Sequence, residues 1–166
     1  DGWNIAMFDP NRLMAAARHI HLKPGIKLVA YQYSDGSNGN GCVVAIPAER
    51  QAPDPVILGE SLFEIRDKLP KWADHCIARH LDGDGSPESY FEASILLREL
   101  HELGAVWHGC SWSAQRILMS PAELPKTKWK WRGAKPADWR PMFTATTVTF
   151  WTYTGLGGER VIRFED

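Results

Sequence analysis

The sequence predicts an α+β fold, and three features of its residue pattern lead to that prediction. Residues 26–47 and 143–165 each contain two runs of β-branched and aromatic residues joined by a glycine-rich turn, the pattern of a β-hairpin. Between them, apolar residues over 86–103 recur at the helical period of about 3.6 residues. Strands and helices do not alternate regularly enough for a doubly wound parallel sheet. We therefore expect one antiparallel sheet, built from two β-hairpins plus a central strand, with helices packed on one face.

The size and composition of the chain are those of an ordinary globular protein. Its 166 residues are 44% hydrophobic and 23% charged, so we expect a single α+β domain over residues 1–166. The sequence has no run of about 18 apolar residues and no signal-peptide pattern at its start, so no membrane association is expected. Three cysteines are too few, and odd in number, for a disulfide framework, which favours a cytoplasmic protein.

The first helix is expected to begin at Asp9 and Pro10, because aspartate is a common N-cap and proline suits the first helical position. Its apolar positions continue to Ile20, and Pro24 with Gly25 ends it. The helix would therefore fill the whole segment before the first hairpin.

The first hairpin is predicted from strands at 26–34 and 42–47, with the segment DGSNGNG between them as a long loop. One face of its first strand is expected to carry Val29, Tyr31 and Tyr33. Two short helices are predicted to follow, over 61–69 and 70–81, the second beginning at Pro70.

The clearest helix of the sequence begins at Ser86 as N-cap, with Pro87 at its first position, and ends at Gly104. One apolar stripe along it is formed by Tyr90, Ala93, Leu96, Leu97, Leu100 and Leu103. The segment 105–113 that follows has strand character and is expected to be the central strand of the sheet. After a long irregular region over 121–141, residues 143–154 and 160–165 are predicted to form the second hairpin.

A first candidate site consists of His101, His108 and Cys110. A cysteine nucleophile needs a nearby base or cation to favour its thiolate, so Cys110 would be the nucleophile or a metal ligand and His108 or His101 the base. On one strand face, His108 and Cys110 would lie roughly 7 Å apart, too far to touch but close enough to flank a bound group, with Trp112 beside them. A buried cysteine and a hydrogen-bonded histidine explain the same residues without any reaction.

The sequence contains no complete metal or cofactor motif. Cys76 and His80 are four residues apart, which would place two ligands on one helix face, but no further ligand accompanies them. The acidic residues near 82–88 lack the glycine and the last glutamate of a calcium loop. We therefore predict no cofactor and no metal.

A second candidate site lies in the irregular region, where cations and tryptophans alternate. The residues concerned are Lys128, Trp129, Lys130, Trp131, Arg132, Trp139 and Arg140. Over 126–166, eight lysines and arginines face four acidic residues, a balance of +4 within a chain of net charge −1. Tryptophan and arginine are favoured at the centres of protein interfaces. The same alternation also fits a segment whose tryptophans pack on the core while its lysines face water.

These observations lead to a ranked set of functions. The leading hypothesis is a non-catalytic binding or adaptor protein that recognises a protein or peptide partner through residues 128–140, because eight tryptophans exceed the needs of a core of this size. The alternative is a small thiol- or metal-dependent enzyme with a pocket around His101, His108 and Cys110. A second alternative is single-stranded nucleic-acid binding through residues 126–140, which the near-neutral net charge disfavours.

Overall fold

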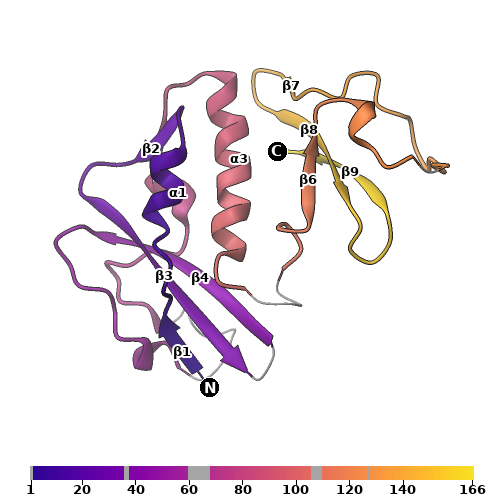
Figure 1. Ribbon diagram of the computed structural model, residues 1–166. Helices are drawn as coiled ribbons and strands as arrows, with labels where there is room; N and C mark the ends of the chain where they lie inside the picture. Colours follow the sequence, from indigo (N-terminus) through magenta and orange to yellow (C-terminus); the bar gives the residue numbers. More distant parts are fainter. Residues whose placement is uncertain (1, 36–37, 60–67, 106–109, 127) are drawn as a thin grey trace. The chain divides into compact units, whose positions relative to one another are not determined.

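Two long strands form the N-terminal hairpin that the sequence predicts. The computed structural model of the protein describes residues 2–35, 38–59, 68–105, 110–126 and 128–166. In it, β3 (Ile26–Asp35) pairs with β4 (Asn38–Pro47) in antiparallel register (Figure 1). The ladder continues to the pair Asp35 and Asn38, so the strands extend into the glycine-rich segment that was expected to be a long loop.

The α+β class is confirmed, but the strands belong to three antiparallel sheets instead of one. The chain, expected to be one domain, gathers into two compact units, Asp1–Trp112 and Ser113–Asp166. The first unit holds a sheet of order β1-β3-β4 and a pair β2-β5, whereas β6, β7, β8 and β9 form the sheet of the second unit. The two predicted hairpins therefore lie in separate sheets.

The other described elements of the first unit are β1 (Gly2–Ile5), α1 (Asn11–Ala16), β2 (Ile20–Leu22), 3-10 helices at Pro55–Leu58 and Ile77–His80, β5 (Leu81–Gly83) and α3 (Pro87–Glu102). Those of the second unit are β6 (Gln115–Leu118), a 3-10 helix at Pro121–Glu123, β7 (Met142–Phe143), β8 (Val148–Thr154) and β9 (Arg160–Glu165). None of the described helices is long and apolar enough to cross a membrane.

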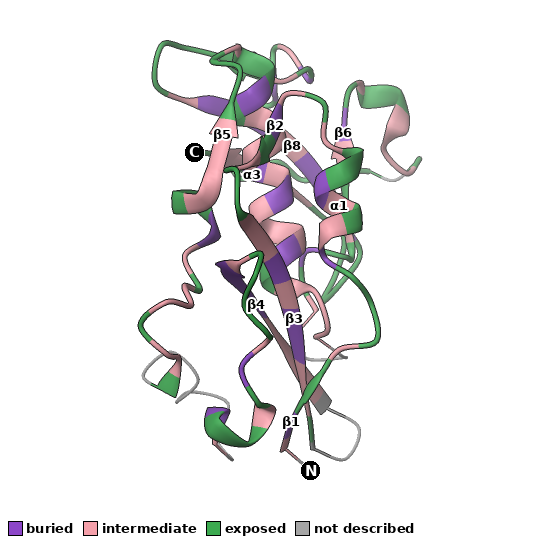
Figure 2. Ribbon diagram, turned by 90° about the vertical axis from the view of Figure 1, so that its left-hand side faces the viewer, coloured by how far each residue is buried: buried purple, intermediate pink, exposed green. Residues whose placement is uncertain are grey.

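Both faces of the β3–β4 hairpin are packed. One face meets α1 and α3 in a core of Met14, Ile20, Leu28, Ala30, Val43, Ala45, Ile77, Leu96 and Leu100, and Figure 2 marks the buried positions along these elements. The opposite face carries Tyr31, with Val29 and Tyr33 beside it as predicted, and packs on Trp3 and Leu58. Helices therefore cover one face, while a 3-10 helix and loop residues cover the other.

The helix α3 confirms its predicted start and end. The hydroxyl of Ser86 accepts a hydrogen bond from the Ser89 amide at 3.2 Å, which is the N-cap that the sequence predicts. Gly104 has φ +91°, a backbone conformation that favours glycine after a helix. Tyr90 departs from the prediction, because 61% of its surface is exposed although it was placed in the apolar stripe.

The first helix is shorter than predicted, and Glu92 of α3 gives the reason. α1 ends at Ala16, and the carboxylate of Glu92 accepts hydrogen bonds from the backbone amides of the next segment, at 2.8 Å from Arg18, 2.6 Å from His19 and 3.1 Å from Ile20. These amides cannot also bond to helical carbonyls, so the chain leaves the helix there. Ile20–Leu22 becomes β2, which pairs with β5.

Two further predictions need correction. The helix expected over 70–81 is replaced by a turn and an isolated β-bridge, in which the backbones of Asp74 and Ala45 exchange hydrogen bonds of 3.0 and 2.8 Å; within this segment only Ile77–His80 is helical. The central strand expected over 105–113 is absent from residues 110–113, and a strand begins only at Gln115. Residues 106–109, and the helix expected at 61–69 apart from its last two residues, lie outside the described residues.

The contribution of Glu92 to stability can be compared with that of Glu88, a neighbouring glutamate of the same helix. Glu92→Ala removes a charged acceptor from three backbone amides, so we expect the free energy of unfolding to fall by about 2–3 kcal/mol. Glu88→Ala, at an exposed first-turn position, should cost less than about 1 kcal/mol. Urea denaturation followed by circular dichroism measures both values, and equal losses would contradict the assignment.

A second prediction concerns pH. His19 Nδ1 lies 2.8 Å from Asp84 Oδ2; this hydrogen bond raises the pKa of His19, and hydrogen bonds from Ser86 and then His19 lower the pKa of Asp84. The histidine contribution is complete below its unfolded pKa of about 6.5 and is lost as pH rises through the raised folded value. The aspartate contribution is present above about pH 4 and is lost as pH falls through the lowered folded value.

The stabilisation from this pair should therefore be greatest between about pH 4 and 6.5. Thermal unfolding should show a larger difference between the wild type and His19→Gln at about pH 5.5 than at about pH 8.5. Asp84→Asn should remove the same pH-dependent difference. A His19→Gln effect that is identical at both pH values would rule out the ion pair.

Candidate binding site

The second unit is organised around β8, the central strand of its sheet. β8 pairs with β9 along one edge and with β6 and β7 along the other. Its residues alternate, as a strand requires: Phe150 and Thr152 are fully buried, whereas Trp151 and Tyr153 lie on the opposite face. The outer aromatic pair is the platform on which the tryptophan-rich loop packs.

The loop of residues 126–140 contacts β8 through a continuous array of aromatic rings. Centroid distances are 6.1 Å between Trp129 and Tyr153, 6.3 Å between Trp129 and Trp131, 6.1 Å between Trp131 and Trp139, and 6.3 Å between Trp139 and Trp151. Edge-to-face and tilted pairs at such distances each contribute about 0.5–1.5 kcal/mol beyond the burial of their surface. The array therefore fastens both ends of the loop to one strand.

Regular hydrogen bonding does not hold this loop. Among its described residues, 125–126 and 128–141, no backbone–backbone hydrogen bond is formed. The Trp129 indole N–H donates to the carbonyl of Pro125 at 3.3 Å, and the Arg140 amide donates to the Asp138 carboxylate at 2.9 Å. The conformation of the loop therefore depends on its tryptophans.

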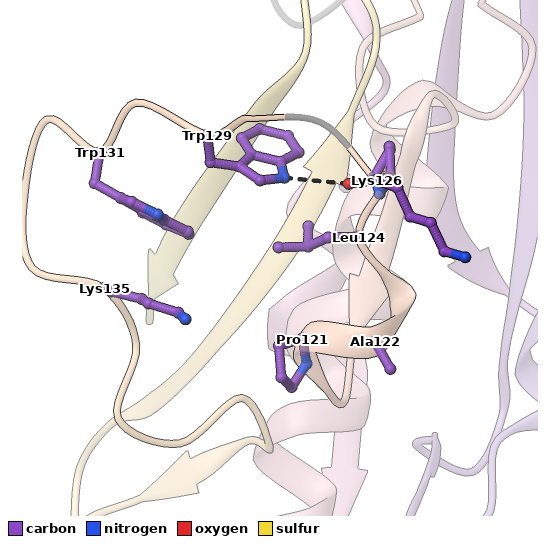
Figure 3. Close-up of a pocket in the computed structure, with 8 residues that line it drawn as sticks. Pro121, Ala122, Leu124, Lys126, Trp129, Trp131 and Lys135 are labelled. Atoms are coloured by element: carbon purple, nitrogen blue, oxygen red, sulfur yellow. Dashed lines mark hydrogen bonds between the residues drawn. The ribbon is translucent and has the colours of Figure 1, made fainter.

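An open cavity of about 420 Å³ lies between this loop and the 3-10 helix at Pro121–Glu123, a size within the ~300–1,000 Å³ range of ligand clefts. Its lining is mostly apolar and includes two cations; it consists of Pro121, Ala122, Leu124, Pro125, Lys126, Trp129, Trp131 and Lys135. Figure 3 shows the Trp131 and Lys135 side chains pointing from the loop toward Leu124 and Pro121. We refer to these eight residues as the tryptophan pocket.

The charges around the pocket are unbalanced. Within the described part of the chain, no carboxylate pairs with Lys126, Lys128, Lys130, Arg132 or Lys135. Arg140 differs, since its guanidinium lies 2.8 Å from Asp138, and this hydrogen bond lowers the pKa of Asp138 to about 2. The loop therefore presents five uncompensated positive charges, two of them on the pocket lining.

The predicted site residues of this loop separate into three groups. Trp129, half-buried, and Trp131, 37% exposed, line the pocket. Lys128, Lys130 and Arg132 are exposed but do not line it. Trp139 is only 5% exposed and Arg140 is paired with Asp138, and neither residue lines the pocket.

Of the predicted residues around Cys110, the structure describes Cys110, His101 and Trp112. The Cys110 thiol donates a hydrogen bond to the Ala105 carbonyl at 3.1 Å, a bond that needs the proton on sulfur. His101 is exposed near the end of α3, and His108 lies outside the described residues. Trp112 is 6% exposed, and its indole N–H donates to Glu99 at 2.8 Å, so it is part of the interior.

The other possible metal ligands of the sequence can also be located in the structure. No cluster of three or more His, Cys, Asp and Glu side chains occurs among the described residues. His80 lies 3.1 Å from Asp74 in an ion-pair geometry, and the segment of Cys76 and His80 is not an α-helix, so their spacing no longer places them on one helix face. None of the three cysteines forms a disulfide bond.

Sequence reasoning missed half of the pocket. Pro121, Ala122, Leu124 and Pro125 were read only as irregular chain, although the short apolar and proline-rich run PAELP precedes the basic residues directly. Lys126 and Lys135 belong to the segment 126–140 of the nucleic-acid alternative but are not among the individually predicted binding residues. The signal that could have found them is the pairing of a proline-rich run with the tryptophans that follow it.

Comparison with known proteins identifies no relative: no family model matches the chain, and neither a curated protein nor a solved structure matches it. The geometry of the pocket is therefore the basis for any functional statement.

The different burial of Trp139 and Trp131 leads to a prediction about the stability of the fold. Trp139→Ala should lower the free energy of unfolding by about 3–5 kcal/mol, because it empties a buried site in the aromatic array. Trp131→Ala should cost only about 0.5–1.5 kcal/mol, since that ring is partly exposed. Urea denaturation monitored by tryptophan fluorescence and circular dichroism compares them; a larger loss for Trp131→Ala would contradict the burial assignment.

Proposed function

We propose that this protein is a non-catalytic binding module that recognises a short peptide segment of a protein partner in the tryptophan pocket. The observation that carries the proposal is the pair Trp129 and Trp131, whose indoles line an open cavity together with prolines. Grooves lined by aromatic residues are a recurrent means of binding extended, proline-containing peptides. Exposed tryptophan is also the residue type most enriched among energetically dominant interface positions.

The size of the pocket favours a peptide over a broad protein surface. A standard protein–protein interface buries about 800 Å² on each partner and is usually flat. A concave cavity of about 420 Å³ instead suits a few consecutive side chains of an extended segment. The loop is held in place by its own aromatic contacts, so little ordering entropy would be lost on binding.

Two observations favour a peptide over a single-stranded nucleic acid. Trp129 and Trp131 have centroids 6.3 Å apart at an interplanar angle of 37°, whereas a base stacked between two rings needs them roughly 7 Å apart and parallel. Trp139, the third tryptophan of the predicted stacking platform, is buried. Pro121, Leu124 and Pro125 on the opposite wall offer apolar surface, which suits an aliphatic side chain better than the polar edges of a base.

The proposal is tested by selecting peptides from a random displayed library against the immobilised protein. Peptides that bind in the pocket should lose about 2 kcal/mol or more of binding free energy, some thirtyfold in Kd, with Trp131→Ala. Phe143→Ala is a matched control, because Phe143 is a similarly exposed aromatic residue of the same unit that does not line the pocket.

Isothermal titration calorimetry of the selected peptides with the wild type and both variants provides the affinities. A selection that enriches no peptide, or peptides whose affinity is unchanged by Trp131→Ala, would refute the proposed function. Loss of binding with Phe143→Ala as well would place the peptide outside the pocket.

A further inference from the structure

The two lysines of the tryptophan pocket determine which peptides it can accept. Lys126 and Lys135 are exposed at the lining, and within the described part of the chain neither has an acidic partner. Three more unpaired cations, Lys128, Lys130 and Arg132, lie on the same loop. Clustered like charges around a low-dielectric wall of prolines and indoles attract counter-charge and repel further cations.

This charge pattern excludes the ligand that paired tryptophans alone would suggest. Indole faces attract cations, and aromatic cages are a common way to bind ammonium groups. In this pocket, however, any ligand ammonium would lie beside the ammonium groups of Lys126 and Lys135. Like-charge repulsion of this kind offsets the cation–π attraction between the indoles and the ligand ammonium.

The apolar lining also argues against a small anion as the main ligand. The six lining residues other than the two lysines offer mainly carbon surface, and a free phosphate would leave that surface exposed to water. A ligand that contacts both the apolar residues and the two lysines of the pocket needs apolar side chains next to negative charges. An extended acidic peptide that alternates proline or aliphatic residues with Glu or Asp has this chemistry.

We propose that the tryptophan pocket selects acidic, proline-containing peptides, with the apolar residue against Trp129 and Trp131 and flanking carboxylates near Lys126 and Lys135. This specificity rests on the proposed function, since it names the class of peptide that the same pocket binds. The polyproline conformation suits such a peptide because successive side chains point outward about 120° apart, so neighbouring residues can reach different walls of the pocket, and its backbone loses little entropy on binding.

The carboxylates contribute selectivity more than total affinity. Exposed pairs between a lysine and a carboxylate are weak, and two pairs from the middle of their range, about 0.5–0.7 kcal/mol each, change Kd by about five- to tenfold. Salt should weaken this difference, because the Debye length falls from about 10 Å at 0.1 M to about 3 Å at 1 M ionic strength. The apolar contacts with the indoles should persist at high salt.

The experiment measures fluorescence anisotropy of labelled peptides that alternate Pro with Glu, Pro with Gln, or Pro with Lys, and of a labelled oligothymidylate. The full chain should bind the Pro-Glu peptide about five- to tenfold more tightly than the Pro-Gln peptide and should bind the Pro-Lys peptide most weakly. The difference between Pro-Glu and Pro-Gln should shrink to about twofold or less at 1 M salt.

Two double variants locate the effect. Lys126→Glu with Lys135→Glu should reverse the preference toward the Pro-Lys peptide. Lys128→Glu with Lys130→Glu is the matched control: it makes the same charge change at exposed positions of the same loop that do not line the pocket, and should retain the Pro-Glu preference. Near-UV circular dichroism verifies that both variants keep the aromatic array.

The outcomes separate this inference from the proposed function. Equal binding of the Pro-Glu and Pro-Gln peptides overturns the acidic specificity and leaves the peptide-binding function standing. Tighter binding of oligothymidylate than of any peptide overturns both in favour of nucleic acid. No binding of any probe overturns the inference, while the library selection independently decides the proposed function. A reversed preference in the Lys128→Glu, Lys130→Glu control assigns the effect to the general loop charge and also overturns it.

Discussion

Ring-to-ring packing on the outer face of β8 is the constraint on which the candidate site depends. Trp139 against Trp151 and Trp129 against Tyr153 tie the two ends of the basic loop to a single strand. Since the loop makes no backbone–backbone hydrogen bonds among its described residues, these aromatic contacts replace the ladders that hold regular structure. A loop held in this way keeps Trp131 partly exposed in a defined position, which is the condition for a preformed binding site.

The same packing divides the tryptophans between two roles, core packing and the lining of the pocket. An alternation of tryptophan and lysine is compatible with core packing or with partner binding. Burial assigns Trp139 to the first role, while Trp129 and Trp131 retain surface on the pocket. Binding through those two remains a proposal, but it now involves two indoles and a wall of prolines instead of the whole basic segment.

The first unit is held together by a different kind of interaction, in which one carboxylate organises several backbone groups. Glu92 binds three consecutive amides before β2, and Glu102 similarly accepts hydrogen bonds from the amides of Ser111 and Trp112. Close packing adds to this: a Cβ on Gly41 of β4 would lie 1.8 Å from the Leu103 carbonyl oxygen, so the end of α3 approaches β4 as only glycine allows. These contacts position α3 on the hairpin without contributing to the candidate site.

The sequence by itself determined those helices and strands that are encoded by patterns of neighbouring residues. Both hairpins and α3 with its Ser86 cap follow from residue period, turn composition and capping, which act within a few residues. Tertiary contacts decided the rest: Glu92 shortened α1, and the bridge between Ala45 and Asp74 kept the chain before Ile77 from forming a helix. The pocket belongs to this second group. Its lining residues are close in sequence, but the path of their loop depends on ring contacts with Tyr153 and Trp151 of β8, which are distant in sequence and which no local pattern encodes.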